Sequence, residues 1–312
     1  MPNLPKTLTP MLAKLVAAVP ADEERWAFEM KWDGIRALAF VESGGLRLLT
    51  RNGNDMTARF PELAALPAAV GQDALLDGEV VALDEQGRPS FQLLQQQYRH
   101  VAPVVLMIFD LLHLGGESLL ALPYTERRAR LEALSLEAEH WRTPPYSAGG
   151  GRKLQAESQR VGLEGVVAKR LDSPYEPGKR TGTWIKIKNH LGQELVIGGW
   201  QEGQGRRSGA IGALLLGYYD ATGELRYAGK VGTGFNDATL ADLGRRLEPL
   251  ARDSSPFATG KPPRGARFVK PELVCEVEFT EWTAEGSIRH PSFKGLRTDK
   301  PAREVVRETP AR

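Results

Sequence analysis

A lysine in a short polar turn is the first residue whose surroundings suggest chemistry. Lys31 ends an alternating stretch that begins at Trp26, and Asp33-Gly34 follows it as a tight turn. A lysine becomes a nucleophile only as the neutral amine, so its pKa must fall from about 10.4 towards the working pH. Burial, neighbouring cations and metal ions can lower it. Lys-x-Asp-Gly is also short enough to arise by chance, and an exposed hairpin turn is the ordinary alternative.

A set of polar residues accompanies Lys31 along the chain. Lys186 and Lys188 alternate with isoleucines, so both ammonium groups project from one face of a strand. The other members stand at the edges of apolar stretches: Glu79 in Asp77-Gly78-Glu79, Phe109-Asp110 at the end of an apolar run, Glu164 at the start of the run to Lys169, and Arg297-Thr298-Asp299-Lys300.

In this order and spacing, the set resembles the covalent nucleotidyltransferase superfamily of DNA ligases, RNA ligases and messenger-RNA capping enzymes. The resemblance covers nearly the whole chain and is closest to ATP-dependent DNA ligases. Leu8-Thr9-Pro10-Met11-Leu12 and Phe293-Lys294-Gly295-Leu296-Arg297 are similar to the ligase domain of bacterial end-joining ligase D proteins. Those proteins also carry polymerase and phosphoesterase modules, so we expect an excised domain or a stand-alone relative.

The resemblance implies ATP as the AMP donor and assigns a nucleotide pocket. Lys31 would attack the α-phosphorus and hold AMP through a phosphoamide bond. Glu29, on the same strand face, would recognise the adenine amino edge, and Phe109 would stack on the base. Arg36 and Glu79 would hold the ribose. The alternatives without a nucleotide are that Glu29 is an exposed carboxylate, that Phe109 is an ordinary core residue and that Glu79 merely caps a bulge.

The resemblance also implies a catalytic set around the phosphates. Glu164 would position Mg²⁺ or Mn²⁺, because carboxylate oxygens suit such ions. Lys186 and Lys188 would neutralise phosphate charge in the transition state and lower the pKa of Lys31 by repulsion. Arg51 would bind the 5′-phosphate of a nick. Without the resemblance, the two lysines could simply lie on the solvated edge of an amphipathic strand, and Arg51 could be an ordinary surface arginine.

A second domain would complete the first step. Arg297, Asp299 and Lys300 would orient the pyrophosphate leaving group when this domain closes over ATP. The domain resembles the OB-fold, a small barrel that commonly binds nucleic acid. In the family it rotates after adenylation and presents another face to DNA, and Asn189-His190-Leu191-Gly192 would be the hinge. AMP would then pass to the 5′-phosphate, which the 3′-hydroxyl attacks.

Apolar periodicity predicts the elements that must hold these residues. The expected fold class is α+β: a nucleotidyltransferase domain of antiparallel sheets with helices over residues 1–189, followed by an OB-fold β-barrel over residues 190–312. A Ser43-Gly44-Gly45 turn joins two early strands, and a bulge is expected at Asp77-Gly78. The expected strands are 26–32, 35–41, 46–50, 74–83, 104–112, 165–171, 183–188, 195–200, 213–219, 225–231 and 273–280; the expected helices are 61–70, 90–98 with Ser90 as N-cap, 126–136 and 238–252, and a basic tail follows residue 280.

Composition narrows the class of protein. The 312 residues are 41% hydrophobic and 26% charged, which is typical of a globular protein of about two domains. The sequence contains no run near the roughly 18 apolar residues of a membrane span, and its start lacks the apolar region of a signal peptide. One cysteine, Cys275, excludes a disulfide framework and a cysteine-based zinc site. A cytoplasmic location is expected, with association to the bacterial nucleoid during repair.

Charge distribution points to a polyanionic partner. Residues 152–188 contain nine Lys/Arg against four Asp/Glu, and residues 289–312 contain seven against three, although the net charge is only +2. Such surpluses suit nucleic acid, while a solvated charged face is the plain alternative. The expected partner of a monomeric enzyme is nicked or broken duplex DNA. Ku and the polymerase and phosphoesterase modules are implied by the end-joining resemblance only.

Three further functions are alternatives. A capping guanylyltransferase shares Lys-x-Asp-Gly and Arg-x-Asp-Lys, but Glu29 and the ligase D-like stretches favour adenine and DNA. An RNA ligase fits less well because the C-terminal region resembles an OB-fold with the closing motif. A non-catalytic nucleic-acid-binding module would carry the motifs as relics, yet no catalytic position is visibly substituted.

Overall fold

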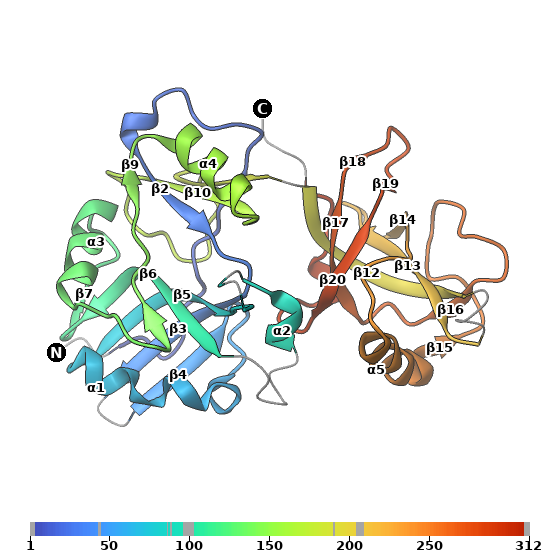
Figure 1. Ribbon diagram of the computed structural model, residues 1–312, viewed down its shortest axis with the longest axis horizontal. Helices are drawn as coiled ribbons and strands as arrows, with labels where there is room; N and C mark the ends of the chain where they lie inside the picture. Colours follow the sequence, from blue (N-terminus) through green and yellow to red (C-terminus); the bar gives the residue numbers. More distant parts are fainter. Residues whose placement is uncertain are drawn as a thin grey trace. The chain divides into compact units, whose positions relative to one another are not determined.

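The computed structural model of the protein describes residues 4–42, 45–85, 87, 89–95, 103–189, 191–203 and 209–308 (Figure 1). The chain divides into two compact units, and the change from one to the other falls between residues 189 and 190. Three expected features lie outside the described residues: the Ser43-Gly44 turn, the helix end at 96–98 and His190 of the hinge. No helix in the described ranges is long and apolar enough to cross a membrane.

The first unit contains two main sheets. The site sheet has the order β1 (Lys14–Leu15), β11 (Trp184–Lys188), β10 (Gly165–Arg170), β2 (Trp26–Lys31) and β9 (Ser147–Ala148). The core sheet has the order β4 (Gly45–Thr50), β3 (Ile35–Glu42), β5 (Ala74–Ala82), β6 (Val104–Leu114) and β7 (Glu117–Ser118), and β8 (Trp141–Arg142) pairs with β6. Pairing is antiparallel except between β1 and β11 and between β6 and β8.

Among the described residues of this unit are four short helices: α1 (Leu66–Val70), α2 (Phe91–Gln95), α3 (Tyr124–Ala133) and α4 (Gly151–Arg160). α3 packs on β6, and α4 packs on β2 and β10. Ser90 caps α2 as expected, because its Oγ accepts a hydrogen bond from the Leu93 N–H at 3.3 Å. Single 3-10 turns cover Glu23–Arg25, Thr57–Arg59 and Pro61–Ala65.

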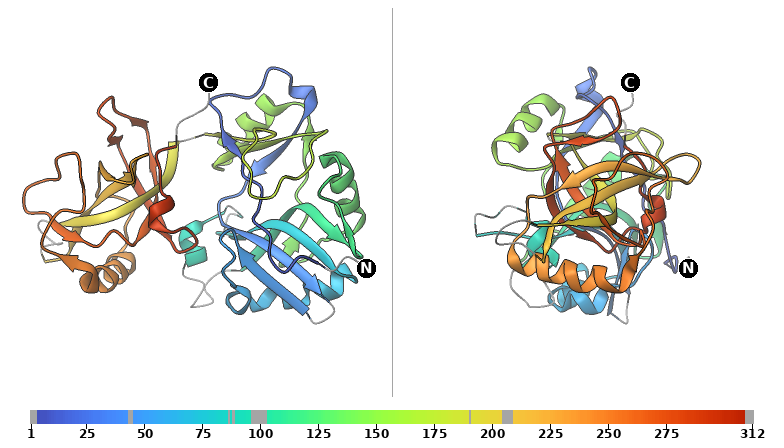
Figure 2. Two further views of the ribbon diagram at one scale, coloured as in Figure 1. Left: turned by 180° about the vertical axis from the view of Figure 1, so that it is seen from behind. Right: turned by 90° about the vertical axis from the view of Figure 1, so that its right-hand side faces the viewer.

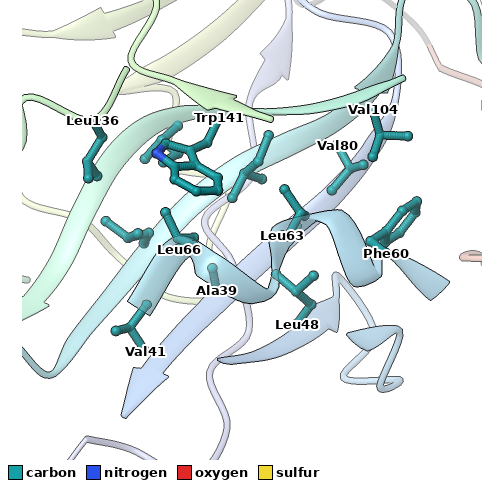
Figure 3. Packing of buried hydrophobic residues seen from close by; sticks show 14 of the residues in the cluster. Ala39, Val41, Leu48, Phe60, Leu63, Leu66, Val80, Val104, Leu136 and Trp141 are labelled. Carbon is teal, nitrogen blue, oxygen red and sulfur yellow. The ribbon is translucent and has the colours of Figure 1, made fainter. Parts of the chain in front are cut away.

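A large apolar cluster fixes the core sheet. Figure 3 shows Leu63 and Leu66 packed over Ala39 and Val80, with Trp141 of β8 beside them. Burial of such side chains supplies roughly 25 cal/mol per Å² of apolar surface removed from water, which stabilises the sheet that carries Arg36, Glu79 and Phe109.

The second unit is an antiparallel β structure. Its main sheet joins β12 (Leu191–Glu202), β13 (Ile211–Tyr219), β14 (Leu225–Val231), β15 (Ala251–Arg252), β16 (Arg267–Val269), β17 (Val274–Phe279) and β20 (Ser292–Arg297), and a small sheet pairs β18 (Glu281–Trp282) with β19 (Ile288–Arg289). Helix α5 (Asp237–Leu247) lies against these strands and packs Leu243 and Leu247 into their core (Figure 2). In the described part of this unit, 3-10 turns cover Glu248–Leu250 and Ala302–Glu304.

The predicted α+β class, with mostly antiparallel sheets and a C-terminal OB-fold region, is confirmed. Three predicted helices differ in detail, and the one expected at 126–136 is α3, Tyr124–Ala133. The helix expected at 61–70 is a 3-10 turn followed by α1, in which Pro67 occupies the first turn. The helix expected at 238–252 ends at Leu247, and the 3-10 turn Glu248–Leu250, with Pro249 as its second residue, follows. Helix α4 was not expected because its residues are mostly polar, and strand β20 lies in the expected tail.

Candidate active site

Strand pairing brings the nucleophile candidate and both predicted phosphate lysines onto one sheet face. Gly165 of β10 is the cross-strand partner of Lys31 in β2 and of Lys188 in β11. Val167, two residues further along β10, is the partner of Glu29 and of Lys186. Residues directly opposite, or two apart along a strand, project from the same face. The backbone register therefore groups four predicted residues from strands that are far apart in sequence.

The opposite face of the same three strands is apolar. Phe28, Val166, Ala168, Ile185 and Ile187 are buried there, and Leu154 of α4 packs against them. This explains the alternation in the sequence: one set of side chains anchors the site sheet and the other set carries its polar groups. The alternation predicted for residues 26–32 is thus observed in β2.

Two glycines allow the backbone to approach closely around Lys31. A Cβ atom at Gly34, in the turn after β2, would lie 2.2 Å from the Val80 carbonyl oxygen of β5. A Cβ atom at Gly165 would lie 2.0 Å from the Ile187 carbonyl oxygen, and Gly165 has a φ of +152°. Any other residue would force the strands apart at either position. The Lys-x-Asp-Gly turn is therefore wedged against the core sheet and is not a free surface hairpin.

Glu164 lies between two lysines at the end of the site sheet. Lys31 Nζ forms an ion pair with Glu164 Oε2, and Lys188 Nζ lies 3.2 Å from Glu164 Oε1. The Glu164 backbone carbonyl accepts a hydrogen bond from the Asn189 N–H at 2.9 Å, so β10 and β11 both hold this residue. The carboxylate thus bridges the candidate nucleophile and one phosphate lysine.

The charges in this group raise the pKa of Lys31, so the lowered pKa expected from the sequence is wrong for this arrangement. Burial acts to lower the pKa of Lys31, and Lys188 adds to that effect, but attraction to Glu164 outweighs both. For Glu164, burial acts to raise the pKa, yet Lys31, Lys188 and Lys186 hold it at about 2. The arrangement described here therefore keeps Lys31 protonated and Glu164 ionised.

Glu29 sits at the centre of a second buried group. The Tyr124 hydroxyl of α3 donates to Glu29 Oε1 at 2.5 Å, and Lys169 Nζ lies 2.8 Å from the same oxygen. Lys169 also donates to the Phe109 backbone carbonyl at 3.0 Å. Glu29 is only 5% exposed, so the exposed carboxylate considered from the sequence is not what the structure contains.

Arg36 lies over the ring of Phe109, with 4.7 Å between the guanidinium carbon and the ring centre. Asp77 of β5 holds this guanidinium through two hydrogen bonds of 2.5 and 2.6 Å, and Tyr175 donates to the same carboxylate at 2.7 Å. Burial opposes the charge on Arg36, but Asp77 outweighs it and raises the arginine pKa. Phe109 also meets Trp184 of β11 edge to face, with ring centres 6.3 Å apart.

Of two further predicted residues, Glu79 lies in the core sheet and Arg51 lies just outside it. Glu79 of β5 is the direct cross-strand partner of Arg36 in β3, so their side chains share a face. The register of β5 against β6 shifts between Asp77 and Gly78, where the bulge was expected. Arg51 lies in the turn after β4, and within the described ranges no hydrogen bond or ion pair joins it to the other predicted site residues.

The remaining predicted residues lie in the second unit. Arg297, at the end of β20, donates to both oxygens of Asp299 at 2.9 and 2.8 Å. Lys300 Nζ donates to Glu194 Oε2 of β12 at 3.2 Å, and Glu276 of β17 lies 3.8 Å from Arg297. Burial opposes the charge on Arg297, but Asp299 and Glu276 raise its pKa well above the usual value.

The donor set fits a nucleotide and a divalent cation. The face that carries Lys31 offers three lysines for phosphates, while Glu29, Phe109 and Arg36 offer an acceptor, a ring and a cation for a nucleoside. Glu164 supplies hard carboxylate oxygens, and Mg²⁺ commonly binds through one or two carboxylates plus phosphate oxygens. In the part of the chain that the structure describes, no group of three or more His, Cys, Asp or Glu side chains could hold a metal by itself.

Sequence reasoning missed the residues that hold the predicted ones in place. Asp77 is fully buried, and a carboxylate inside the apolar run that starts at Ala74 is a sequence signal that could have identified it as the partner of a buried cation. Tyr124, Tyr175 and Trp184 carry no local pattern that separates them from ordinary core aromatics. Lys169 was recognised as part of a motif but received no role.

Comparison with known proteins covers both units. A family model described as "ATP dependent DNA ligase domain" matches residues 10–188, and one described as "ATP dependent DNA ligase C terminal region" matches residues 207–300. The solved structure "mycobacterial DNA ligase D complexed with ATP and MES" is 44% identical and covers 96% of this chain and 98% of its own, with a TM-score of 0.74.

Two longer proteins are similar over nearly the whole chain. The "Multifunctional non-homologous end joining DNA repair protein LigD" of Mycobacterium tuberculosis is 45% identical over 96% of this chain and 40% of its own length. The "Multifunctional non-homologous end joining protein LigD" of Pseudomonas aeruginosa is 46% identical over 99% of this chain and 37% of its own. The chain thus spans about two fifths of the length of these relatives.

Proposed function

The chain belongs to the ATP-dependent DNA ligases, and we propose that it joins 3′-hydroxyl and 5′-phosphate ends of duplex DNA through AMP bound covalently to Lys31. The observation that carries this assignment is the register of β2, β10 and β11, which groups Lys31, Glu29, Lys186 and Lys188 on one face. Glu164 adjoins Lys31 and Lys188 there.

The first step forms the lysyl-AMP intermediate. The Lys31 amine attacks the α-phosphorus of ATP, a nitrogen–phosphorus bond forms, and the bond to the bridging oxygen of pyrophosphate breaks. Lys31 first releases its ammonium proton to solvent, the attacking nitrogen releases a second proton to solvent as the bond forms, and pyrophosphate leaves with the electron pair. Lys186 and Lys188 stabilise the charge that develops on the phosphate oxygens, as fixed cations do in phosphoryl transfer.

The nucleoside would be held between the two sheets of the first unit. Glu29 accepts from the adenine amino group, Phe109 stacks on the base, and Arg36 with Glu79 contacts the ribose. The supporting geometry is the 4.7 Å approach of the Arg36 guanidinium to the Phe109 ring and the cross-strand pairing of Arg36 with Glu79. Asp77 holds Arg36 by two hydrogen bonds, so the cation is oriented before the nucleotide binds.

Glu164 would contribute the protein ligand of a divalent cation, Mg²⁺ or Mn²⁺. When bound, such an ion neutralises charge on the phosphates of ATP. The carboxylate is ionised and adjoins the phosphate lysines, which supports this role. Arg297, Asp299 and Lys300 of the second unit would orient pyrophosphate during the first step.

The later steps transfer AMP to DNA and then release it. The 5′-phosphate of a break attacks the phosphorus of lysyl-AMP, and the Lys31–phosphorus bond breaks. The 3′-hydroxyl then attacks the activated 5′-phosphorus, which forms the phosphodiester and expels AMP. Arg51 would bind the 5′-phosphate. These roles for Arg51 and for the two-domain closure rest on the family resemblance.

The biological setting is a further part of the proposal. The likeness to the end-joining LigD proteins supports a role in bacterial repair of broken duplex DNA by non-homologous end joining. Ku and the polymerase and phosphoesterase modules of a larger protein would be its partners, and the enzyme itself would act as a monomer in the bacterial cytoplasm.

The test is to incubate the protein with ATP or GTP labelled at the α-phosphate, and then with nicked duplex DNA. We expect covalent label from ATP, loss of that label on addition of the nick, and a sealed strand. Nicks that end in a 3′ ribonucleotide, assayed in parallel, define the preferred end. Label from GTP alone would instead support a capping-type guanylyltransferase and contradict the proposal.

A further inference from the structure

One oxygen of the Glu29 carboxylate is held by two buried donors. Both the Tyr124 hydroxyl, at 2.5 Å, and Lys169 Nζ, at 2.8 Å, contact Oε1. Tyr124 and Lys169 are 0% and 1% exposed. Across the described ranges, no hydrogen bond to Oε2 is found. The carboxylate therefore has one oxygen fixed by the protein and one that can accept from a ligand.

We propose that Tyr124 and Lys169 are positioning residues that orient Glu29 so that its Oε2 accepts a hydrogen bond from the exocyclic amino group of adenine. They thereby set the preference for a purine with an amino group at this ring position over a purine with a carbonyl oxygen there. This inference rests on the proposed adenine-binding role of Glu29. An ionised carboxylate accepts from an amino group but repels the carbonyl oxygen that hypoxanthine and guanine carry at the same ring position.

The protonation states favour this orientation. Burial, together with the nearby Glu29 carboxylate, raises the pKa of Tyr124 well above its usual value, so its hydroxyl stays a donor. Burial lowers the pKa of Lys169, while Glu29 and Asp110 oppose that change. Both neighbours of Oε1 can thus donate, and Glu29 is left to act as an acceptor.

Lys169 also links the purine edge to the stacking ring. Its Nζ donates to the Phe109 backbone carbonyl at 3.0 Å and lies 4.5 Å from the centre of the Phe109 ring. Lys169 belongs to the site sheet and Phe109 to the core sheet. One ammonium group therefore holds the acceptor and the stacking surface in a fixed relation, which a rigid purine requires.

A purely structural role makes a different prediction. If Tyr124 and Lys169 only stabilised the packing of α3 and the core sheet on the site sheet, their loss would lower the melting temperature. It would also lower the rate of adduct formation equally for all nucleotides. If they orient Glu29, the ratio of kcat/KM for ATP to that for inosine triphosphate must fall. Tyr146, whose ring lies 5.8 Å from that of Tyr124, supplies a matched control.

The experiment measures lysyl-nucleotide formation with ATP and with inosine triphosphate in wild type, Tyr124→Phe, Lys169→Met and Tyr146→Phe. We expect Tyr124→Phe to lower the ATP preference about tenfold, mainly through a higher KM for ATP, since one buried hydrogen bond to a charged group is lost. Lys169→Met should lower it at least as much, and Tyr146→Phe should leave it unchanged.

A double variant separates positioning from stability. In a Glu29→Ala background, Tyr124→Phe should produce no further change in the nucleotide ratio, because it acts through Glu29. An unchanged ratio in folded Tyr124→Phe and Lys169→Met would overturn the inference while leaving the ligase assignment intact. If wild type formed no adduct with ATP, the proposed function would fail, and this inference with it. Should Lys169→Met unfold, the isosteric Tyr124→Phe alone decides.

Discussion

Lys31 and Glu164 form an ion pair between the end of β2 and the residue that precedes β10. The proposed nucleophile and the proposed metal ligand thus neutralise each other, while Lys188 occupies the second oxygen of the same carboxylate. The pKa of Lys31 therefore depends on Glu164, because any cation that binds the Glu164 carboxylate also changes the charge around the Lys31 amine.

Replacement of Lys31 by alanine should abolish the covalent adduct with AMP, because no other group would form the phosphoamide bond. The protein should stay folded, since the Lys31 side chain lies on the polar face of the site sheet and the apolar face is untouched. Intact-mass measurement after incubation with ATP checks this. Lys153→Ala, an exposed lysine of α4, is the control and should keep the adduct; an adduct that persists in Lys31→Ala would identify a different nucleophile.

Glu164→Gln should weaken the metal dependence of adenylation. Loss of the charged ligand is expected to raise the Mg²⁺ or Mn²⁺ concentration at half-maximal rate by about 10- to 100-fold, the scale found when groups around metal sites are altered. The measurement is the rate of adduct formation across a metal titration. Glu157→Gln removes an exposed carboxylate of α4 that pairs with Arg160, and should leave the titration unchanged. An identical curve for Glu164→Gln would remove its metal role.

Lys186→Ala and Lys188→Ala should each slow adenylation by about 100-fold, the scale of one lost stabilising donor in a transition state. Lys188→Ala should also disturb Glu164, because their side chains are 3.2 Å apart. Single-turnover rates at saturating ATP separate these effects from binding. Equal rates for wild type and Lys186→Ala would show that this lysine does not act on the phosphates. Lys179→Ala, an exposed lysine paired with Glu176, is the control.

Arg297→Ala and Asp299→Ala should impair only the first step. If this pair orients pyrophosphate, adduct formation should fall about 100-fold, while sealing of nicked DNA that is already adenylated should continue. Arg289→Ala, an exposed arginine of β19 that pairs with Glu281, should behave as wild type in both assays. Equal losses in both assays would instead indicate a role in DNA binding or in the fold of the second unit.

A buried ion pair next to Phe109, one of the proposed nucleotide-binding residues, leads to a prediction about stability. Asp110 and Arg127 are both fully buried and joined by hydrogen bonds of 2.8 and 2.9 Å. Asp110→Ala would leave a buried guanidinium without its counter-charge and should lower the free energy of unfolding by about 3–5 kcal/mol. Urea unfolding checks this. Asp172→Ala, which breaks an exposed pair with Arg170, should change it by less than about 1 kcal/mol.

The sequence predicted the strands of the site because their alternation is a local property. β2 and β11 alternate between apolar and polar residues, so the faces of Lys31, Lys186 and Lys188 could be deduced without a structure. The pairing of Glu29 with Tyr124 could not, since it joins residues 95 positions apart and depends on where α3 packs. The raised pKa of Lys31 likewise depends on Glu164, which lies 133 positions away.

Gly165 is important to the site because it lacks a Cβ atom. It lies in register between Lys31 and Lys188, where a Cβ would meet the Ile187 carbonyl oxygen at 2.0 Å. Even alanine there would push the strands apart and widen the distance between the proposed nucleophile, Lys31, and the proposed phosphate-binding residue, Lys188. The site therefore depends on the spacing of its strands as well as on its reactive groups. A mutational survey restricted to reactive side chains would miss Gly165, the position that sets this spacing.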